Sequence, residues 1–360
     1  MEGNVETMSA AAQPYDALLL VSFGGPEKPD DVLPFLQNVT RGRGIPDERL
    51  VEVGEHYYGF GGRSPINDQC RALKAAIETD LAANGIDLPV YWGNRNWDPY
   101  LPDTLRAMAA DGVQHAVYFV TAAYASYSGC RQYRENLAAA VATVGDDAPE
   151  LHRLPHYFDR PGLVEPFVDA TLAALDLLPT SARMVFVTHS IPTAMNEASG
   201  AGGAYVAQHH AVARAVADEV ARRTGGSSGY DLVYCSRSGP PSQPWLEPDV
   251  GDHLEQLAAS GAPGAAVIPI GFVSDHMEVI YDLDTEAKEV AARVGLPFAR
   301  AATPGVDPRF VSMVRELVLE RASAERGDQT VPALRGTEDR PSAYCHKTCC
   351  PNPRTALAAL

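Results

Sequence analysis

Short apolar runs of strand length alternate with amphipathic stretches of helix length along most of the chain. In the helical stretches, such as residues 164–177, apolar residues recur with the spacing of one helix face. Strands that alternate with helices in this way indicate βαβ units and a parallel sheet. The pattern therefore predicts an α/β protein, with strands at residues 16–23, 90–92, 113–121, 151–155, 184–188, 232–234 and 265–270.

The length of the chain predicts two such domains, because 360 residues exceed one ordinary core. The first series of strands ends before a break near residues 158–161, and Pro308 suits the first turn of a last helix. A polar segment rich in Pro and Gly then leads to a tail with cysteines. The predicted parts are an N-terminal domain at 14–157, a C-terminal domain at 158–303, a returning helix at 304–326, and a tether with its Cys tail at 327–360.

The chain is acidic, with 46 Asp and Glu against 29 Lys and Arg and a net charge of −17. This charge argues against nucleic acid or an anionic membrane as a partner, although it leaves room for a local basic patch. The first fifteen residues lack the basic start and apolar core of a signal peptide, and no apolar run approaches the ~20 residues of a membrane span. We therefore expect a soluble, cytoplasmic protein.

Acidic residues and a histidine follow the strand at 265–270. His276 and Glu278 come where that strand ends, at the sheet edge where open α/β proteins bind ligands. On the helix expected there, Glu278, Asp282 and Glu286 have i, i+4, i+8 spacing and share one face. Three carboxylates in a line can pass a cation from one to the next.

A structural interpretation of the same segment is a capping box. Asp275 and Glu278 fit the D-x-x-E pattern, and acids suit the first turn of a helix. However, like charges at i, i+4 repel by roughly 0.2–0.5 kcal/mol per pair, and no Lys or Arg separates these acids before Lys288. Something other than helix stability favours this arrangement.

A second candidate, His189, follows the strand at 184–188. A lone histidine at a strand end is more often structural, but an imidazole paired with Glu278 suits proton transfer or divalent metal binding. His209 and His210 lie on a surface-like helix, and the loop at 200–203 lacks the strand-to-helix context of a nucleotide loop. We interpret both of these features as structural.

Several longer motifs are more specific, and in this order they identify a family. They are FGGP at 23–26, GGRSP at 61–65, THSIP at 188–192, SRSGPP at 236–241 with PWLEPD at 244–249, and GFVSDHMEVIYD at 271–282. From about residue 16 to 321 the chain resembles the ferrochelatases, which insert iron into protoporphyrin or coproporphyrin. The resemblance implies two Rossmann-like domains, each with a four-stranded parallel sheet, and a porphyrin cleft between them.

The resemblance also implies roles for individual residues. His189 and Glu278 would form the metal and proton site on opposite sides of the cleft, with His276, Asp282 and Glu286 on an acidic path beside it. Insertion of Fe(II) removes two pyrrole protons, so a neutral His189 would accept a proton while Glu278 receives metal or proton. A cleft that binds the macrocycle bent would lower the barrier further.

The porphyrin itself would contact a separate set of residues. Phe23 stands where members of the Gram-positive branch commonly carry Tyr, whose phenol can meet the product iron; Phe offers no donor atom. Arg suits propionate carboxylates, although solvated loop arginines are an equally good interpretation of Arg41 and Arg43. The predicted porphyrin-binding residues are Phe23, Arg41, Arg43, Ser64, Tyr124, Ser126 and Trp245.

The tail resembles the C-terminal cluster extension of some ferrochelatases, including actinobacterial ones. It offers Cys345, Cys349 and Cys350, and Cys130 is the predicted fourth thiolate of a [2Fe–2S] cluster. A zinc site that uses His346 is the alternative.

We therefore expect an enzyme of haem synthesis that inserts Fe(II), preferring coproporphyrin III to protoporphyrin IX, with transient contact with neighbouring enzymes of the pathway. The alternatives are a chelatase for another metal or tetrapyrrole, and a porphyrin carrier or iron–sulfur sensor on a chelatase scaffold.

Overall fold

The computed structural model describes residues 10–42, 44–239, 242–328 and 348–352. The chain divides into two compact units, and each is described by itself. Unit 1 comprises residues 1–121, 133–155 and 311–344, and unit 2 comprises residues 122–132, 156–310 and 345–360. The segment 122–132 thus groups with the later part of the chain, and the last helix is shared between the units.

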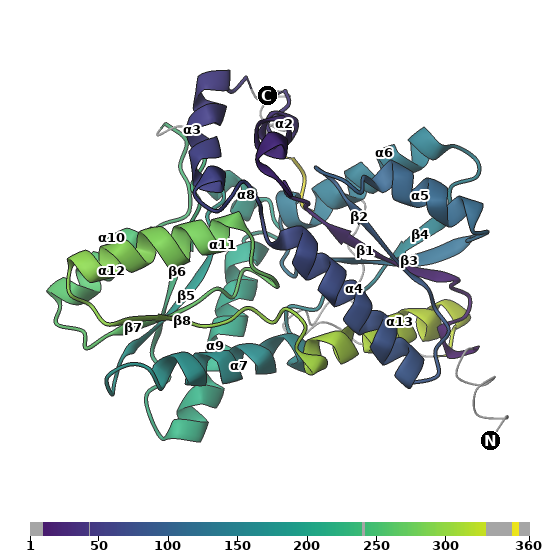
Figure 1. The fold of residues 1–360 in the computed structure, drawn as a ribbon. Coiled ribbons are helices and arrows are strands. Elements are labelled where there is room, and N and C mark those ends of the chain that lie inside the picture. The colour runs from purple at the N-terminus through teal and green to yellow at the C-terminus, as the bar shows by residue number, and fades with distance from the viewer. Residues whose placement is uncertain (1–9, 43, 240–241, 329–347, 353–360) are drawn as a thin grey trace. The chain divides into compact units, whose positions relative to one another are not determined.

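Unit 1 is built on a parallel four-stranded sheet in the order β2-β1-β3-β4 (Figure 1). All six residues of β1 are buried, as expected for a central strand covered on both faces. Arg315 of α13 pairs with Asp80 of α4 at 2.7 Å, which links the last helix to this unit. The strands are β1 (Ala17–Ser22), β2 (Val90–Asn94), β3 (His115–Val120) and β4 (Glu150–Arg153), and the helices are α2 (Pro29–Val39), α3 (Asp47–Tyr58), α4 (Ile66–Ala83), α5 (Leu101–Ala110), α6 (Gln132–Val144) and most of α13 (Pro308–Arg326).

Unit 2 repeats this architecture with the order β6-β5-β7-β8, again all parallel. Helices α10 and α12 cover one face of the sheet and α7 and α9 the other (Figure 1). The strands are β5 (Arg183–His189), β6 (Tyr230–Cys235), β7 (Ala265–Ile268) and β8 (Phe298–Arg300); the helices are α7 (Pro161–Leu175), α8 (Thr193–Glu197), α9 (Ala204–Thr224), α10 (Val250–Ala259), α11 (Met277–Tyr281) and α12 (Lys288–Arg293), with π-helical turns η2 (Tyr127–Arg131) and η3 (Asp282–Ala287).

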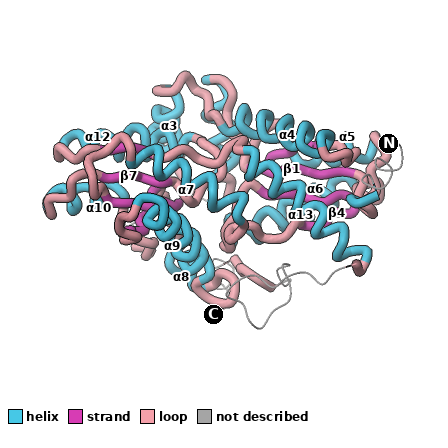
Figure 2. Tube along the Cα trace, turned by 90° about the horizontal axis from the view of Figure 1, so that it is seen from below, coloured by secondary structure: helices cyan, strands magenta, loops and turns pink. Residues whose placement is uncertain are grey.

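The predicted fold class is confirmed, since both units are α/β with four-stranded parallel sheets. Figure 2 shows strands flanked by helices in both units. Sequence periodicity missed one strand, β8, because three residues at a sheet edge are too short to show alternation. Strand β7 ends at Ile268 because Pro269, which follows, has no N–H for the ladder.

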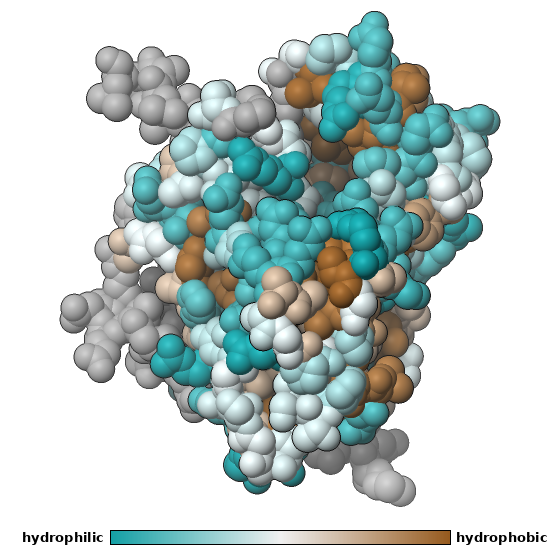
Figure 3. All heavy atoms as spheres, turned by 90° about the vertical axis from the view of Figure 1, so that its left-hand side faces the viewer, coloured by the Kyte–Doolittle hydropathy of each residue, from teal (hydrophilic) through white to brown (hydrophobic). Residues whose placement is uncertain are grey.

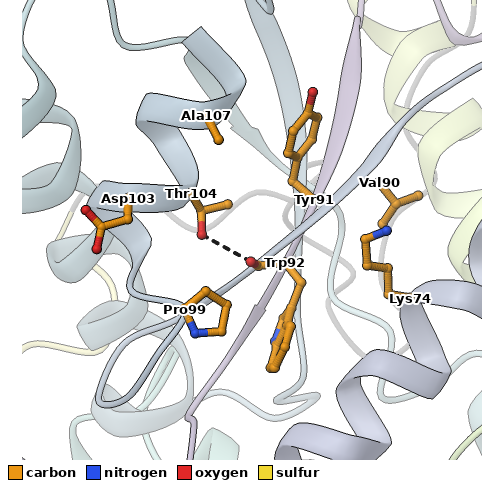
Figure 4. Close-up of a pocket in the computed structure, with 8 residues that line it drawn as sticks. All are labelled: Lys74, Val90, Tyr91, Trp92, Pro99, Asp103, Thr104 and Ala107. Atoms are coloured by element: carbon orange, nitrogen blue, oxygen red, sulfur yellow. Dashed lines mark hydrogen bonds between the residues drawn. The ribbon is translucent and has the colours of Figure 1, made fainter. Parts of the chain in front are cut away.

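The molecular surface is mainly hydrophilic on the face shown in Figure 3, where hydrophobic side chains form small separate patches. A hollow of about 450 Å³ lies in unit 1 between α4, α5 and the edge strand β2 (Figure 4). Its charged neighbours are engaged elsewhere, as Lys74 pairs with Glu78 and Asp103 with Arg106. No helix in the described part of the chain combines the length and apolar character needed to span a membrane.

Candidate active site

His189 and Glu278 meet at the carboxyl edge of the unit 2 sheet. His189 is the last residue of β5, and Glu278 lies in the first turn of α11, which follows the neighbouring strand β7. The imidazole Nε2 is 3.4 Å from the carboxylate Oε1, and the two side chains are 31% and 47% exposed. The expectation that they face each other from opposite sides of a cleft is therefore wrong, because parallel strands of one sheet bring both to one edge.

The segment that leads to Glu278 passes very close to β5. A Cβ atom on Gly271 would lie 2.2 Å from the Oγ1 atom of Thr188, so no other residue fits without displacing the strand. The N–H of Gly271 also donates to the carbonyl of Val187 at 3.2 Å. This close approach fixes the distance between the end of β5 and the start of α11.

The two partners shift each other's pKa. Burial lowers the pKa of His189, but the Glu278 carboxylate and the Ser190 carbonyl more than offset it and raise the pKa to about 9. Burial raises the pKa of Glu278, and the His189 charge more than offsets it, so this pKa falls to about 2. At neutral pH the metal-free pair is thus an imidazolium beside a carboxylate, whereas the sequence interpretation expected a neutral His189.

His276 differs from His189 in its charge, because its pKa is lowered and not raised. It is the N-cap of α11, where its Nδ1 accepts a hydrogen bond from the N–H of Glu278 at 3.2 Å. Burial lowers its pKa, so the ring is neutral. Asp275 does not cap the helix and instead pairs with Arg300 at 3.2 Å. The capping-box interpretation is therefore wrong, because the cap is His276.

The line of acids continues through a π-helical turn rather than a regular α-helix. Asp282 begins the turn η3 and Glu286 lies inside it; such turns insert an extra residue into a helix and are frequent at functional sites. The Asp282 carboxylate accepts a hydrogen bond from the Ser236 hydroxyl. Burial, together with the charges of Glu278 and Glu286, raises the pKa of Asp282 to about 7 although the Ser236 bond opposes it. The three carboxylates therefore interact electrostatically.

A buried polar network supports His189 from behind. The Tyr205 hydroxyl donates to the backbone carbonyl of His189 at 2.8 Å, and the hydroxyls of Tyr205 and Thr188 are 2.8 Å apart. The Nε2 atom of His209 lies 2.8 Å from the same Thr188 hydroxyl. Burial lowers the pKa of His209 to about 3, so this ring is neutral.

The sequence interpretation placed His209 on a surface-like helix, and this placement is wrong. Its side chain is fully buried in α9, and the Tyr124 ring stacks on it with centroids 3.6 Å apart. The signal was present in the sequence, because Tyr205, His209, Val212 and Val216 fall on one helical face. The polarity of the histidine pair concealed that face.

The predicted porphyrin-binding residues of unit 2 have structural partners. The Tyr124 hydroxyl donates to the Ile270 carbonyl at 2.8 Å, and Ser126 caps η2 by accepting from the Gly129 N–H. Trp245 forms an isolated bridge with Pro192, and its buried indole N–H has no hydrogen-bond partner among the described residues. Contact of these side chains with a porphyrin stays a prediction.

In unit 1, the Phe23 ring packs edge-on against Phe35. The guanidinium of Arg95 lies 5.3 Å from the centre of the Phe23 ring. Ser64 is buried, and Arg41 is exposed just after α2. Arg43 lies outside the described residues. The roles of all four toward a porphyrin stay predictions.

Three cysteine sulfurs gather in unit 2. The Sγ atoms of Cys349 and Cys350 are 3.6 Å apart. Hydrogen bonds with Cys130 and then with Cys349, together with burial, raise the pKa of the Cys350 thiol. No disulfide joins these three cysteines to one another or to another described cysteine, and Cys345 and His346 lie outside the described ranges. Within those ranges no three His, Cys, Asp or Glu side chains form a ready-made metal site.

Comparison with known proteins gives concordant results. A family model described as ferrochelatase matches residues 15–322. The chain is 58% identical to the coproporphyrin III ferrochelatase of Streptomyces coelicolor over 96% of both chains. It is 56% identical to that of Frankia alni, covering 97% of this chain and 89% of the relative, and 51% identical to that of Nocardia farcinica, covering 96% and 99%.

Among solved structures, SirB from Bacillus subtilis with Fe³⁺ aligns with a TM-score of 0.51 at 13% identity, covering 86% of this chain and 97% of SirB. At this identity the likeness concerns the fold alone, and it agrees with the paired parallel sheets. The family model and the relatives extend over the His189 and Glu278 segments and nearly the whole chain. The chain belongs to the ferrochelatase family.

Proposed function

We propose that this protein inserts Fe(II) into coproporphyrin III during haem synthesis. The names of relatives that are 51–58% identical over nearly the whole chain support the reaction and the substrate. The observation that carries the proposal is the 3.4 Å contact between His189 and Glu278, with Asp282 beside them at a raised pKa. This arrangement offers a metal ligand, a proton acceptor and an acidic route in one place.

The reaction breaks two pyrrole N–H bonds, forms the bonds between iron and the four ring nitrogens, and releases two protons. Ionised Glu278 is available to a divalent cation at neutral pH, and Fe(II) that binds there displaces the proton from His189. The neutral His189 then accepts a pyrrole proton, and Asp282, with a pKa of about 7, passes protons onward. Glu286 extends this route, and His276 holds Glu278 through the helix cap.

Substrate preference rests on a different set of residues. Coproporphyrin III carries four propionates and protoporphyrin IX carries two, so additional cationic or hydroxyl contacts favour the first. Arg41 and Arg43 supply a basic pair in an acidic chain, and Ser64, Tyr124 and Ser126 supply hydroxyls. Phe23 and Trp245 are proposed to pack against the macrocycle.

We also propose that Cys130, Cys345, Cys349 and Cys350 hold a [2Fe–2S] cluster. The gathering of the three described sulfurs supports this ligand set. A bound cluster would supply one-electron redox chemistry or a structural link between η2 and the tail. The alternative is a zinc site that uses His346.

A cytoplasmic location and transient contact with neighbouring enzymes of the pathway also stay predictions.

The test of the reaction is anaerobic Fe(II) insertion into coproporphyrin III and protoporphyrin IX, followed by absorption. We expect turnover with both and a higher kcat/KM for coproporphyrin III. Absence of insertion into either porphyrin, with both still bound, would support the carrier or sensor alternative. Efficient insertion of cobalt or nickel in place of iron would favour the alternative that the protein is a chelatase for another metal.

The test of the cluster is chemical analysis of anaerobically purified protein, in which we expect about two iron and two sulfide per chain. The protein should be brown, and Cys130→Ser should lose the colour. Zinc without sulfide would show that the alternative site is the correct one.

A further inference from the structure

Arg300 lies outside every sequence motif, and it binds two acids of the segment that carries Glu278. It is the last residue of β8, the edge strand beside β7 in the unit 2 sheet (Figure 1). Its Nε and Nη2 atoms donate to the two carboxylate oxygens of Asp284 at 2.8 and 2.7 Å. Nη1 and Nη2 donate to the two oxygens of Asp275, both at 3.2 Å. One guanidinium thus bridges two carboxylates that lie on either side of Glu278 in the sequence.

Further hydrogen bonds hold this bridge in place. Nη1 of Arg300 also donates to the Ala301 carbonyl at 3.4 Å, and the Thr303 hydroxyl donates to Asp275 at 3.0 Å. The Arg300 side chain is 16% exposed, so the ion pairs are largely shielded from water. A guanidinium that binds a carboxylate through two N–H groups fixes its orientation, which a Lys ammonium cannot do. Arg300 therefore sets the positions of both carboxylates and not only their charge.

The two bound acids frame the acids of the proposed site. Asp275 directly precedes His276, the N-cap of α11, whose Nδ1 accepts from the N–H of Glu278. Asp284 lies in the π-helical turn η3, which begins at Asp282. Such turns are rare in proteins, so contacts from outside the turn help to hold it. Arg300 is thus attached to the start of α11 and to η3 at the same time.

Arg300 also divides the acids of this segment into two sets. Asp275 and Asp284 are paired with its charge. Among the described residues, neither Glu278 nor Asp282 has a Lys or Arg as an ion-pair partner, and histidines and a serine hydroxyl contact them instead. Like charges close together in one helical segment repel one another. The guanidinium offsets part of this repulsion and leaves Glu278 and Asp282 available to a metal ion.

We propose that Arg300 is a positioning residue for iron insertion. By binding Asp275 and Asp284 together, it holds α11 and η3 in the arrangement that presents Glu278 and Asp282 to Fe(II). This inference rests on the proposed function, because it assigns the metal to these two acids. Arg300 acts through the segment and touches neither iron nor porphyrin.

The kinetic test compares two variants of the full-length protein under anaerobic Fe(II). Arg300→Met removes the charge and the paired N–H groups, whereas Arg300→Lys keeps the charge alone. We expect both to raise the KM for Fe(II) by about tenfold, the scale on which loss of a supporting contact weakens a metal site. The KM for porphyrin should stay unchanged. A merely structural role would reduce the amount of folded enzyme and would change neither KM.

A wild-type KM for Fe(II) in Arg300→Met would overturn the proposal. A wild-type value in Arg300→Lys beside a raised value in Arg300→Met would also overturn it, because charge and not position would then be responsible. Asp284→Asn keeps Arg300 and weakens its grip on η3, so the test does not depend on the folding of an Arg300 variant. We expect Asp284→Asn to raise the KM for Fe(II) as well, and a wild-type value there would count against the bridge.

Arg309 provides a matched control in the same unit. It also bridges two carboxylates, Asp307 at 2.8 Å and Asp169 at 2.6 Å, but neither belongs to the segment that carries Glu278. Arg309→Met should therefore leave the KM for Fe(II) unchanged. An equal rise in Arg309→Met and Arg300→Met would overturn the specific role of Arg300.

Hydrogen exchange in the metal-free protein tests positioning without turnover. We expect the backbone amides of residues 277–287 to exchange about tenfold faster in Arg300→Met than in wild type, because the segment opens more often once its outside contact is lost. The amides of α9 should keep their wild-type rates. Unchanged exchange at residues 277–287 would show that Arg300 does not hold the segment.

The wild type separates this inference from the function on which it rests. A wild type that inserts no iron would overturn the proposed function and, with it, the role of Arg300. An active wild type whose Arg300 variants keep the wild-type KM for Fe(II) would overturn the role of Arg300 alone.

Discussion

The hydroxyl of Ser236, just beyond β6, donates a hydrogen bond to the carboxylate of Asp282, the first residue of the π-helical turn. This bond crosses from one strand end to the acidic segment that follows β7. Because burial and two neighbouring carboxylates oppose ionisation of Asp282, the Ser236 bond keeps its pKa from rising further. The site thus holds Asp282, which titrates near neutrality, beside Glu278, which stays ionised.

Replacing Asp282 should stabilise the fold in a pH-dependent way. Its folded pKa, about 7, lies above the unfolded value near 3.8, so the native state binds more protons and loses stability as pH rises between these values. Asp282→Asn should raise the free energy of unfolding by about 1–2 kcal/mol at pH 8 and leave it unchanged near pH 4. Urea unfolding of both proteins at pH 4 and pH 8 measures this, with Asp218→Asn, at an exposed position, as the control. An equal gain in the free energy of unfolding at the two pH values would contradict the prediction.

Substitutions of Asp282 and Glu286 should change the KM for Fe(II) more than the KM for porphyrin. Asp282→Asn and Glu286→Gln remove charges from the proposed acidic route but leave Glu278 intact. We expect a higher apparent KM for Fe(II) and little change in kcat. Initial rates at varied Fe(II) measure this, and a change confined to the KM for porphyrin would argue against the route.

Glu278 and His189 should control turnover. Glu278→Gln and His189→Ala should each lower kcat by about 10²-fold or more, because each removes a metal ligand or proton acceptor. Porphyrin binding, followed by fluorescence quenching, should persist. His210→Ala is a matched control, since that imidazole contacts Tyr230 instead. Near-wild-type turnover in either site variant would refute the assignment.

Nuclear magnetic resonance can test the charge state of the pair directly. In metal-free wild type, His189 should titrate with a pKa near 9. In Glu278→Gln the largest opposing charge is gone and burial dominates, so its pKa should fall below that of the wild type by at least about one unit. An unchanged His189 titration in this variant would show that the 3.4 Å contact does not exist in solution.

The network behind His189 should matter for turnover. Tyr205→Phe removes the hydroxyl that donates to the His189 carbonyl, which should cost about 1 kcal/mol of stability. It should also lower kcat more than it changes KM, because the ring of His189 loses its fixed position. Tyr230→Phe, whose hydroxyl contacts exposed His210, is the control; identical kinetics of the two variants would exclude a positioning role for Tyr205.

Loss of both Arg41 and Arg43 should reduce the preference for coproporphyrin III. Charged hydrogen bonds to the extra propionates contribute about 1.5–3 kcal/mol when well formed, enough for roughly tenfold discrimination. The comparison is kcat/KM for the two porphyrins in wild type and in the double alanine variant. A preference that survives both substitutions would assign propionate recognition to other residues.

Periodicity in the sequence was sufficient to predict the fold class. Of the eight strands in the described residues, seven were predicted near their observed positions, since a buried parallel strand such as Ala265–Ile268 is a continuous apolar run. His189 and Glu278 were also proposed from sequence, because His189 closes such a run and Glu278 opens the helix that follows another. Strand β8 was missed since a three-residue edge strand has too little pattern.

The sequence by itself therefore determined the two parallel sheets and the family, and it supplied the candidate site residues, because local periodicity and motif order are properties of the chain. Only the tertiary structure decided that β5 and β7 are neighbours, which puts His189 and Glu278 in contact within one unit. It also decided that His209 is buried, that the pKa of Asp282 rises toward neutrality and that the N–H of Gly200 donates to the sulfur of Cys350. These properties depend on burial and on charges far away in sequence, and no local pattern carries that information.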